Sequence, residues 1–194
     1  MTEQEVLKLY ETRGALLRGH FVLSSGRHAD TYLQSALVLT DLAVAERLAR
    51  ALVAKLGSLV ENIDLVVAPA IGGLVIGQEV ARVLGRPYIF TERKDGEMQL
   101  RRGFTVPQGA RVLIVEDVIT TGLSVRECQA VIEKAGGRVQ AIAALVDRNP
   151  NAQGRFSVPM VALVALEVPS WPPESCPLCR DAHASAPVKP GSRQ

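Results

Sequence analysis

One stretch constrains the fold more than any other: an apolar run at residues 112–115 that is followed at once by two acids, a hydroxyl-rich turn and a helical pattern. Four consecutive apolar residues, mostly β-branched, predict a strand that is buried on both faces, as in the middle of a parallel sheet. We expect Glu116 and Asp117 to end this strand. Ser124 and Glu127 stand at the spacing of a capping box for the helix that follows. The stretch therefore predicts one βα unit.

Strand and helix patterns alternate along the rest of the chain, which predicts an α/β fold with a doubly wound, mainly parallel sheet. We expect helices at about residues 2–13, 41–56 and 73–84, strands at 64–68, 87–90, 139–146 and 160–168, and a hairpin within residues 20–34. The first 36 residues or so are too few to fold alone, so they are expected to form a hood on a domain that spans residues 1–168. Residues 169–194 are proline-rich and are predicted to be a C-terminal tail.

The turn after the central strand is the first candidate for a binding site. Open α/β sheets bind ligands at the carboxyl ends of their strands, and a helix N-terminus favours an anion such as phosphate. Thr120, Thr121 and Ser124 would surround a phosphate, whereas Glu116 and Asp117 would accept hydrogen bonds from a vicinal diol. The alternative is an ordinary βα loop whose hydroxyls cap a helix, but a cap needs one hydroxyl rather than three.

Three other segments carry candidate groups. Arg148 follows a core strand, where its planar guanidinium would suit a carboxylate, although a surface ion pair is the alternative. The charged run 91–103 is predicted to be a mobile loop or loose hairpin, whose cations would either be solvated or close over a polyphosphate. The pair Gly72-Gly73 would either wrap a second anion or let a helix pack closely on a strand. It does not match a G-x-G-x-x-G dinucleotide fingerprint.

Residues 112–124 closely resemble the 13-residue motif by which type I phosphoribosyltransferases bind 5-phosphoribosyl-1-pyrophosphate (PRPP). Three more segments are similar to those of the orotate phosphoribosyltransferase family: Leu23 to Arg27, Arg93-Lys94 and Asp147-Arg148. The resemblance covers about residues 1–168. It implies Mg2+-dependent transfer of the 5-phosphoribosyl group from PRPP to orotate, which gives orotidine 5'-monophosphate and pyrophosphate in de novo pyrimidine (UMP) biosynthesis.

The resemblance also implies residue roles. Glu116, Asp117 and Lys94 would be the catalytic groups, and Thr120 and Arg148 would contact orotate. Mg2+ would be held mainly by PRPP and not directly by the protein. In the family the residues that match Arg93 and Lys94 help to bind pyrophosphate, often from the neighbouring subunit, so a homodimer with shared active sites is expected. The PRPP-binding residues would be Glu116, Asp117, Val118, Ile119, Thr120, Thr121, Gly122, Leu123 and Ser124, together with Arg93 and Lys94.

The chain also departs from the family pattern. Ser24 stands where many members have a lysine, and Ile71-Gly72 replaces an aromatic-lysine pair. Neither a histidine nor a second lysine follows Lys94 in the charged run, and we hypothesise that Arg101 and Arg102 replace these cations. Two other functions stay open: a purine phosphoribosyltransferase, which would have no carboxylate for Arg148 to bind, and a non-catalytic PRPP-sensing regulator, which should carry a basic nucleic-acid-binding surface.

Composition narrows the class of protein further. The 22 basic and 20 acidic residues give a net charge of +2, and aromatic residues make up only 4%, so nucleic-acid binding is not favoured. The N-terminus does not look like a signal peptide and no apolar run has transmembrane length, so we expect a cytoplasmic protein without membrane contact. An odd number of cysteines argues against a disulfide framework. Cys176, Cys179 and His183 give only three ligands for zinc, so a tail docked on the body is the favoured interpretation.

Overall fold

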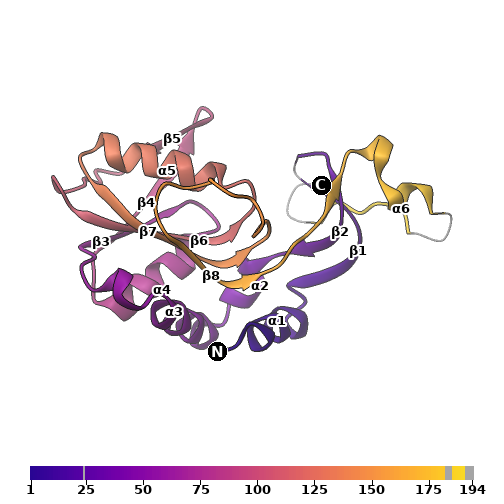
Figure 1. Ribbon diagram of the computed structural model, residues 1–194, viewed down its shortest axis with the longest axis horizontal. Coiled ribbons are helices and arrows are strands. Elements are labelled where there is room, and N and C mark those ends of the chain that lie inside the picture. The colour runs from indigo at the N-terminus through magenta and orange to yellow at the C-terminus, as the bar shows by residue number, and fades with distance from the viewer. Residues whose placement is uncertain (24, 182–184, 191–194) are drawn as a thin grey trace.

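A six-stranded sheet forms the centre of the molecule in a computed structural model, which describes residues 1–23, 25–181 and 185–190. The strand order is β5-β4-β3-β6-β7-β8, and neighbouring strands are parallel except for the β4–β5 pair (Figure 1). The predicted α/β fold with a mainly parallel sheet is confirmed. The strands are β3 (Leu65–Pro69), β4 (Tyr88–Lys94), β5 (Glu97–Leu100), β6 (Arg111–Ile119), β7 (Arg138–Asp147) and β8 (Met160–Ala165).

Helices cover both faces of this sheet, as a doubly wound fold requires. On one face α3 (Leu42–Leu56) and α4 (Leu74–Leu84) pack, and α5 (Leu123–Lys134) covers the other (Figure 1). Successive residues of a strand point to opposite faces. Leu113 and Val115 of β6 accordingly lie in the core under α3 and α4, whereas Val112 and Ile114 lie in the core under α5.

Local capping explains where the N-terminal helices begin. Helix α1 (Glu3–Thr12) starts with a capping box between Thr2 and Glu5, and the Asp41 carboxylate accepts hydrogen bonds from the first turn of α3. A short helix that the sequence did not predict, α2 (Ser35–Leu39), joins the hood to α3. Its Ser35 shares a 2.9 Å hydrogen bond with the buried Tyr10 hydroxyl, which ties α2 to α1.

Two expectations about the central βα unit are wrong. The acids do not end the strand: β6 continues to Ile119, because β7 continues beside it and pairs with it from Glu116 opposite Ala144 to Ile119 opposite Asp147. The capping box is also absent from α5. This helix starts after Gly122, which adopts the left-handed conformation at the N-cap without a side-chain cap, and Glu127 pairs with Arg93 instead.

The charged run 91–103 forms a regular hairpin over most of its length. Strands β4 and β5 pair antiparallel from Thr91 opposite Leu100 to Lys94 opposite Glu97. Asp95 and Gly96 form the two-residue turn, both with positive φ angles, as tight hairpin turns of this kind require. The hairpin extends one edge of the main sheet beside α5 (Figure 1).

The hood is a second, three-stranded antiparallel sheet of order β1-β2-β9. Strands β1 (Leu16–Val22) and β2 (His28–Leu33) form the expected hairpin, and β9 (Ser170–Trp171) comes from the C-terminal tail. The 3-10 helix η2 (Pro173–Ser175) and α6 (Pro177–Arg180) follow β9 beside the hood (Figure 1). Val188 then hydrogen-bonds with the backbone of β1. The tail is thus built into the hood.

Gly77 shows how tightly α4 lies on the sheet. A Cβ atom at this position would stand 2.8 Å from the Ala68 Cβ and 2.9 Å from the Tyr88 ring. We expect Gly77→Ala to lower the free energy of unfolding by about 1–3 kcal/mol, even though alanine favours helix, because overpacking outweighs propensity. Urea denaturation measures this change. An unchanged or raised stability would show that α4 can move away from β3.

Candidate active site

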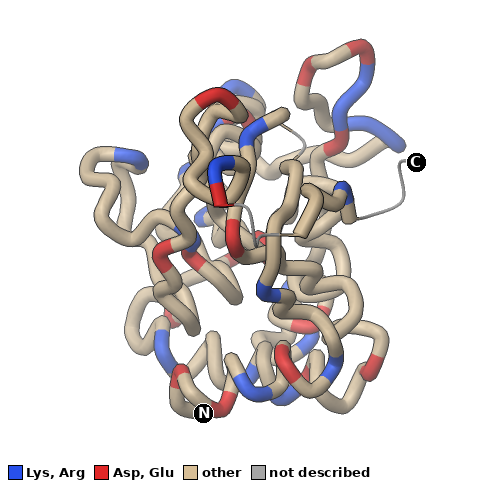
Figure 2. The backbone as a smooth tube through the Cα atoms, turned by 90° about the vertical axis from the view of Figure 1, so that its right-hand side faces the viewer, with Lys and Arg blue, Asp and Glu red and all other residues tan. Residues whose placement is uncertain are grey.

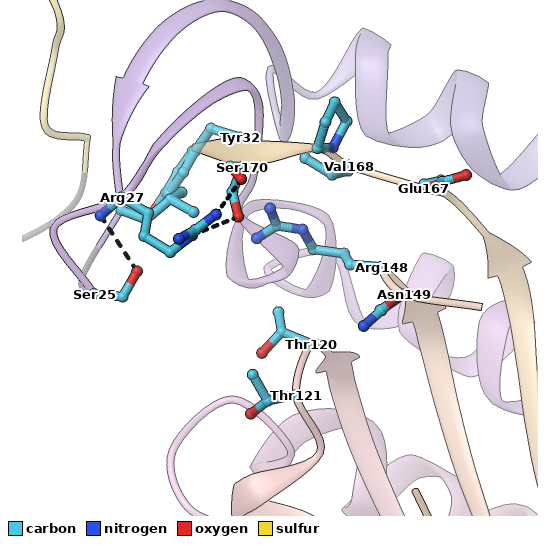
Figure 3. Close-up of a pocket in the computed structure, with 12 residues that line it drawn as sticks. Ser25, Arg27, Tyr32, Thr120, Thr121, Arg148, Asn149, Glu167, Val168 and Ser170 are labelled. Carbon is cyan, nitrogen blue, oxygen red and sulfur yellow. Dashed lines mark hydrogen bonds between the residues drawn. The ribbon is translucent and has the colours of Figure 1, made fainter. Parts of the chain in front are cut away.

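A cavity of about 690 Å3 lies between the hood and the carboxyl ends of β6 and β7 (Figure 3). Two residues that the sequence singled out for orotate, Thr120 and Arg148, both line it. Its walls come from the hood, from the turn after β6, from the turn after β7 and from the segment before β9. The lining residues are Leu23, Ser25, Arg27, Tyr32, Thr120, Thr121, Arg148, Asn149, Glu167, Val168, Pro169 and Ser170.

Arg148 is a largely buried cation without an ion pair in the described part of the chain. Its Nε atom is buried and has no hydrogen-bond partner among those residues. The side chain extends from the end of β7 into the space between Thr120 and the hood residue Ser170 (Figure 3). Burial lowers the pKa of the guanidinium, which Asp30 and Tyr32 partly oppose. Because a buried charge without a partner is costly, this arrangement suits an incoming anion.

The residue before Arg148 is Asp147, whose negative charge is neutralised by Arg155. Its carboxylate accepts two hydrogen bonds from Arg155, at 2.8 and 2.5 Å, and both side chains are nearly buried. Arg155 also donates to the carbonyl of Thr120 at 3.3 Å and so connects the turns after β6 and β7. The sequence interpretation missed Arg155. The signal for it was Asp147 itself, since a carboxylate at the end of a buried strand needs a cation.

Glu116 and Asp117 lie next to the Gly72-Gly73 turn and are not among the cavity-lining residues. A Cβ atom on Gly72 would stand 2.4 Å from the Asp117 Oδ1, and one on Gly73 would stand 2.8 Å from the Val115 carbonyl and 3.1 Å from the Glu116 Oε1. Glycine is therefore required here for close packing against the acids. Burial, together with the charge of Asp117, raises the pKa of the Glu116 carboxyl well above its ordinary value.

The predicted phosphate turn leaves the start of α5 without a side-chain cap. The Thr121 hydroxyl accepts a hydrogen bond from the Leu123 N–H at 3.3 Å, and Arg126 donates to the Thr121 carbonyl at 2.7 Å. Phe156 packs on Gly122, where a Cβ atom would stand 2.6 Å from the ring. The turn is thus held from three sides, while the helix N-terminus has the N–H groups and the dipole that favour an anion.

The cations of the β4–β5 hairpin do not line the cavity. Arg93 makes a two-pronged ion pair with Glu127 of α5, and Arg101 and Arg102 both pair with Glu92. Lys94 is exposed and has no ion pair in the described residues. The structure therefore brings together Thr120, Thr121 and Arg148, but leaves Arg93 and Lys94 apart from them. Ser24, the departure in the hood, lies outside the described residues, whereas Ile71 is 84% exposed.

Comparison with known proteins identifies the family. A model of the phosphoribosyl transferase domain matches residues 37–155. The chain is 50% identical over 194 residues to the orotate phosphoribosyltransferase of Sphingopyxis alaskensis, which covers all of this chain and 98% of that protein. It is also 50% identical over 193 residues to the orotate phosphoribosyltransferase of Heliobacterium modesticaldum, over the full length of both. The chain belongs to the orotate phosphoribosyltransferase family.

The three-dimensional fold agrees with this membership. The crystal structure of orotate phosphoribosyltransferase from Aeropyrum pernix matches with a TM-score of 0.70 and 30% identity, over 83% of this chain and 93% of that one. The type I phosphoribosyltransferase fold expected from the central motif is thus confirmed. Among the described residues, no helix is both long and apolar enough to span a membrane.

The raised pKa of Glu116 gives a pH-dependent stability. Between the ordinary carboxyl pKa and the raised one, the unfolded chain loses a proton that the folded chain keeps, so rising pH destabilises the fold. We expect Glu116→Gln to match the wild type near pH 4.5 and to become relatively more stable above it, by up to about 1.4 kcal/mol per pH unit over that window. Thermal unfolding from pH 4.5 to 9 measures this, with the exposed Glu61→Gln as control. Parallel pH profiles for the wild type and Glu116→Gln would contradict it.

Removing the charge of Arg148 and removing that of Arg155 should have different effects on the free energy of unfolding. We expect Arg148→Met to leave the ligand-free protein as stable as the wild type, or more stable by up to about 2 kcal/mol, because it removes a buried Nε atom that has no hydrogen-bond partner among the described residues. The matched Arg155→Met variant should lose about 3–5 kcal/mol, because it leaves Asp147 buried and unpaired. Urea denaturation compares the two. Equal losses would show that Arg148 is paired after all.

Proposed function

We propose that this chain transfers the 5-phosphoribosyl group from PRPP to orotate, giving orotidine 5'-monophosphate and pyrophosphate in de novo pyrimidine biosynthesis. The observation that carries this proposal is Arg148, a largely buried guanidinium that has no ion pair among the described residues and extends into a cavity beside the PRPP motif. A carboxylate on a planar ring would supply the missing partner through two parallel hydrogen bonds. The identity with curated orotate phosphoribosyltransferases supports the same base.

PRPP would lie along the carboxyl edge of the sheet. Its 5-phosphate would bind at residues 120–124, where α5 starts without a side-chain cap. Its ribose hydroxyls would donate to Glu116 and Asp117. Each of these carboxylates already accepts one backbone N–H, from Asp117 and Val118 respectively, through a single oxygen. The Asp117 carboxylate thus keeps a second oxygen for the ribose, whereas the buried Glu116 carboxyl also interacts with the Asp117 side chain.

The acid pair also fits Mg2+, which prefers oxygen ligands and commonly binds proteins through one or two carboxylates plus substrate phosphates. In this proposal PRPP holds most of the ion, and Glu116 and Asp117 would be the protein groups nearest to it. When bound, Mg2+ supplies positive charge against the pyrophosphate oxygens as the leaving group departs.

The reaction breaks the bond between C1 of the ribose and the pyrophosphate oxygen and forms a bond from C1 to a ring nitrogen of orotate. The transition state resembles an oxocarbenium ion, so the protein must position the nitrogen and keep water away. Arg148 would fix the orotate carboxylate, and Thr120 would contact the ring from the opposite wall. The hydrogen bond from Arg155 to the Thr120 carbonyl fixes the distance between the turn after β6 and the turn after β7.

A homodimer with shared active sites would complete the machinery. Arg93 and Lys94 lie on the hairpin and do not line the cavity of their own chain. This position supports the proposal that they bind pyrophosphate in the active site of the partner subunit. The hairpin would exchange the Arg93–Glu127 ion pair for contacts with pyrophosphate when it closes over the substrates. In this assignment Lys94 is the catalytic cation. We also place the protein in the cytoplasm, where this pathway would need it.

Two alternative functions are less well supported. A purine has no carboxylate, so a purine phosphoribosyltransferase would leave Arg148 without a partner. A PRPP-sensing regulator would need a basic surface for nucleic acid. On the side that Figure 2 shows, basic and acidic positions are interspersed along the backbone.

Arg148 provides the decisive test. We expect purified protein with PRPP and Mg2+ to consume orotate but not hypoxanthine, guanine, xanthine or adenine, followed by absorbance. Arg148→Ala should lower kcat/KM for orotate by about 100-fold or more, because a charged pair in a buried site is worth several kcal/mol. It should leave the affinity for PRPP within about threefold in equilibrium binding, because the proposed PRPP contacts lie on β6, in the turn that leads into α5 and on the β4–β5 hairpin, and do not include Arg148.

The matched control is Arg138→Ala, an exposed arginine at the opposite end of the same strand β7, which should keep wild-type turnover. Turnover of a purine would keep the PRPP site and discard the assignment of the base. PRPP binding without turnover of any base would favour the regulator instead.

A further inference from the structure

A second cluster of chemically reactive side chains lies in the hood, outside the active-site cavity. It contains His20 of β1, His28 of β2, and Cys176 and Cys179 at the two ends of the turn that opens α6. The ligand atoms of the four side chains all lie within 4.8 Å of one another. His20, His28 and Cys176 are buried, although 156 residues separate His20 from Cys176.

The distances match those around a tetrahedral ion. The His20 Nε2 stands 3.6 Å from the Cys176 Sγ and 3.7 Å from the Cys179 Sγ, and the His28 Nδ1 stands 3.2 Å from the Cys179 Sγ. Zinc bonds of about 2.3 Å to sulfur and about 2.0–2.1 Å to nitrogen place tetrahedral ligand atoms roughly 3.3–3.8 Å apart. The two histidine nitrogens, at 2.8 Å, would need to separate by about half an ångström.

The surroundings of His20 support a ligand role. Its other ring nitrogen, Nδ1, lies 3.1 Å from the Ser185 carbonyl oxygen. A histidine that binds a metal through one nitrogen typically donates from the other to a carbonyl or carboxylate, which fixes both the tautomer and the ring orientation. The tail thus supplies two candidate ligands and also the group that orients a third.

We propose that His20, His28, Cys176 and Cys179 bind one structural zinc ion that fastens the C-terminal tail to the hood. Two sulfur and two nitrogen ligands in a tetrahedral set are typical of zinc, and four protein ligands leave no open position for catalysis. His183, the third ligand that the sequence suggested, lies outside the described residues and is not needed. Both histidines were missed because nothing in the sequence connects the hairpin with a motif near the other end of the chain.

The ion would stabilise one wall of the active-site cavity. Strand β9 is short and pairs with β2 at two positions, His28 opposite Trp171 and Ala29 opposite Ser170. Arg27 of the cavity wall donates to both the side chain and the carbonyl of Ser170. A metal that crosslinks β1 and β2 to the segment just after β9 would keep this short strand in register. Because the four ligands come together only in the folded chain, the free energy of zinc binding would add to the free energy of folding.

Metal content tests the proposal directly. Untagged full-length protein, produced in zinc-supplemented medium and purified with a reductant but without chelator, should contain about one zinc ion per chain by mass spectrometry of the element. The exposed Cys179→Ser variant should lose at least tenfold of this content. Cys128→Ala, which removes the remaining cysteine, in the core under α5, should keep it. A chelator should lower the thermal unfolding temperature of the wild type but not that of Cys179→Ser.

Cobalt substitution tests the ligand set without any variant. Metal-free wild type titrated with Co2+ should develop the intense visible bands of a tetrahedral site, together with near-ultraviolet thiolate-to-cobalt charge transfer that saturates at one equivalent. Wild type without zinc, or a Cys176–Cys179 disulfide in the reduced preparation, would overturn the proposal. So would a Cys179→Ser protein that keeps its zinc, or a cobalt complex without thiolate bands.

Discussion

The pairing of β6 with β3 on one side and with β7 on the other fixes where each group of the candidate active site stands. Strand β6 carries the acid pair and ends in the phosphate turn, and its register with β7 places Asp147 opposite Ile119. Arg148 consequently follows directly beside Thr120 across the two strand ends. A shift of one residue in this register would turn the acids and the apolar residues of β6 to the wrong faces. The site therefore depends on backbone hydrogen bonds deep in the core.

Arg155 and Arg148 differ in their partners: the first stabilises the fold, and the second is available to bind an anion. Asp147 and Arg155 satisfy each other, and their pair joins the turns of the site into one unit. Arg148, one residue further along β7, is left without an anion in the described chain. A charge held in this way lowers stability before a ligand arrives and strengthens binding afterwards, because its desolvation has already been met during folding. The two hydrophobic cores offset this loss of folding free energy.

Patterns within a short stretch predicted most of the fold, because periodicity and turn residues act locally. Strands β3, β4, β6, β7 and β8, helices α3, α4 and α5, and the hood hairpin followed from such patterns, and so did the positions of Thr120 and Arg148 at one edge. The predictions failed where contacts with segments distant in the sequence determine the local structure. Strand β6 extends past Glu116 and Asp117 because it pairs with β7 over these residues. Glu127 forms an ion pair with Arg93 and does not cap α5. Likewise, Arg155 and the two hood histidines acquire their partners only through the tertiary fold.

The hood sheet also sets an order of assembly on the ribosome. Strands β1 and β2 are made first, but the strand that completes their sheet begins only at Ser170, after every strand of the main sheet has been synthesised. A two-stranded hairpin by itself is marginally stable in water. The nascent chain can thus build its parallel sheet while the hood is still incomplete. The cavity takes its final shape last, so a protein truncated before β9 would have residues 112–124 in place but would lack one wall of the cavity.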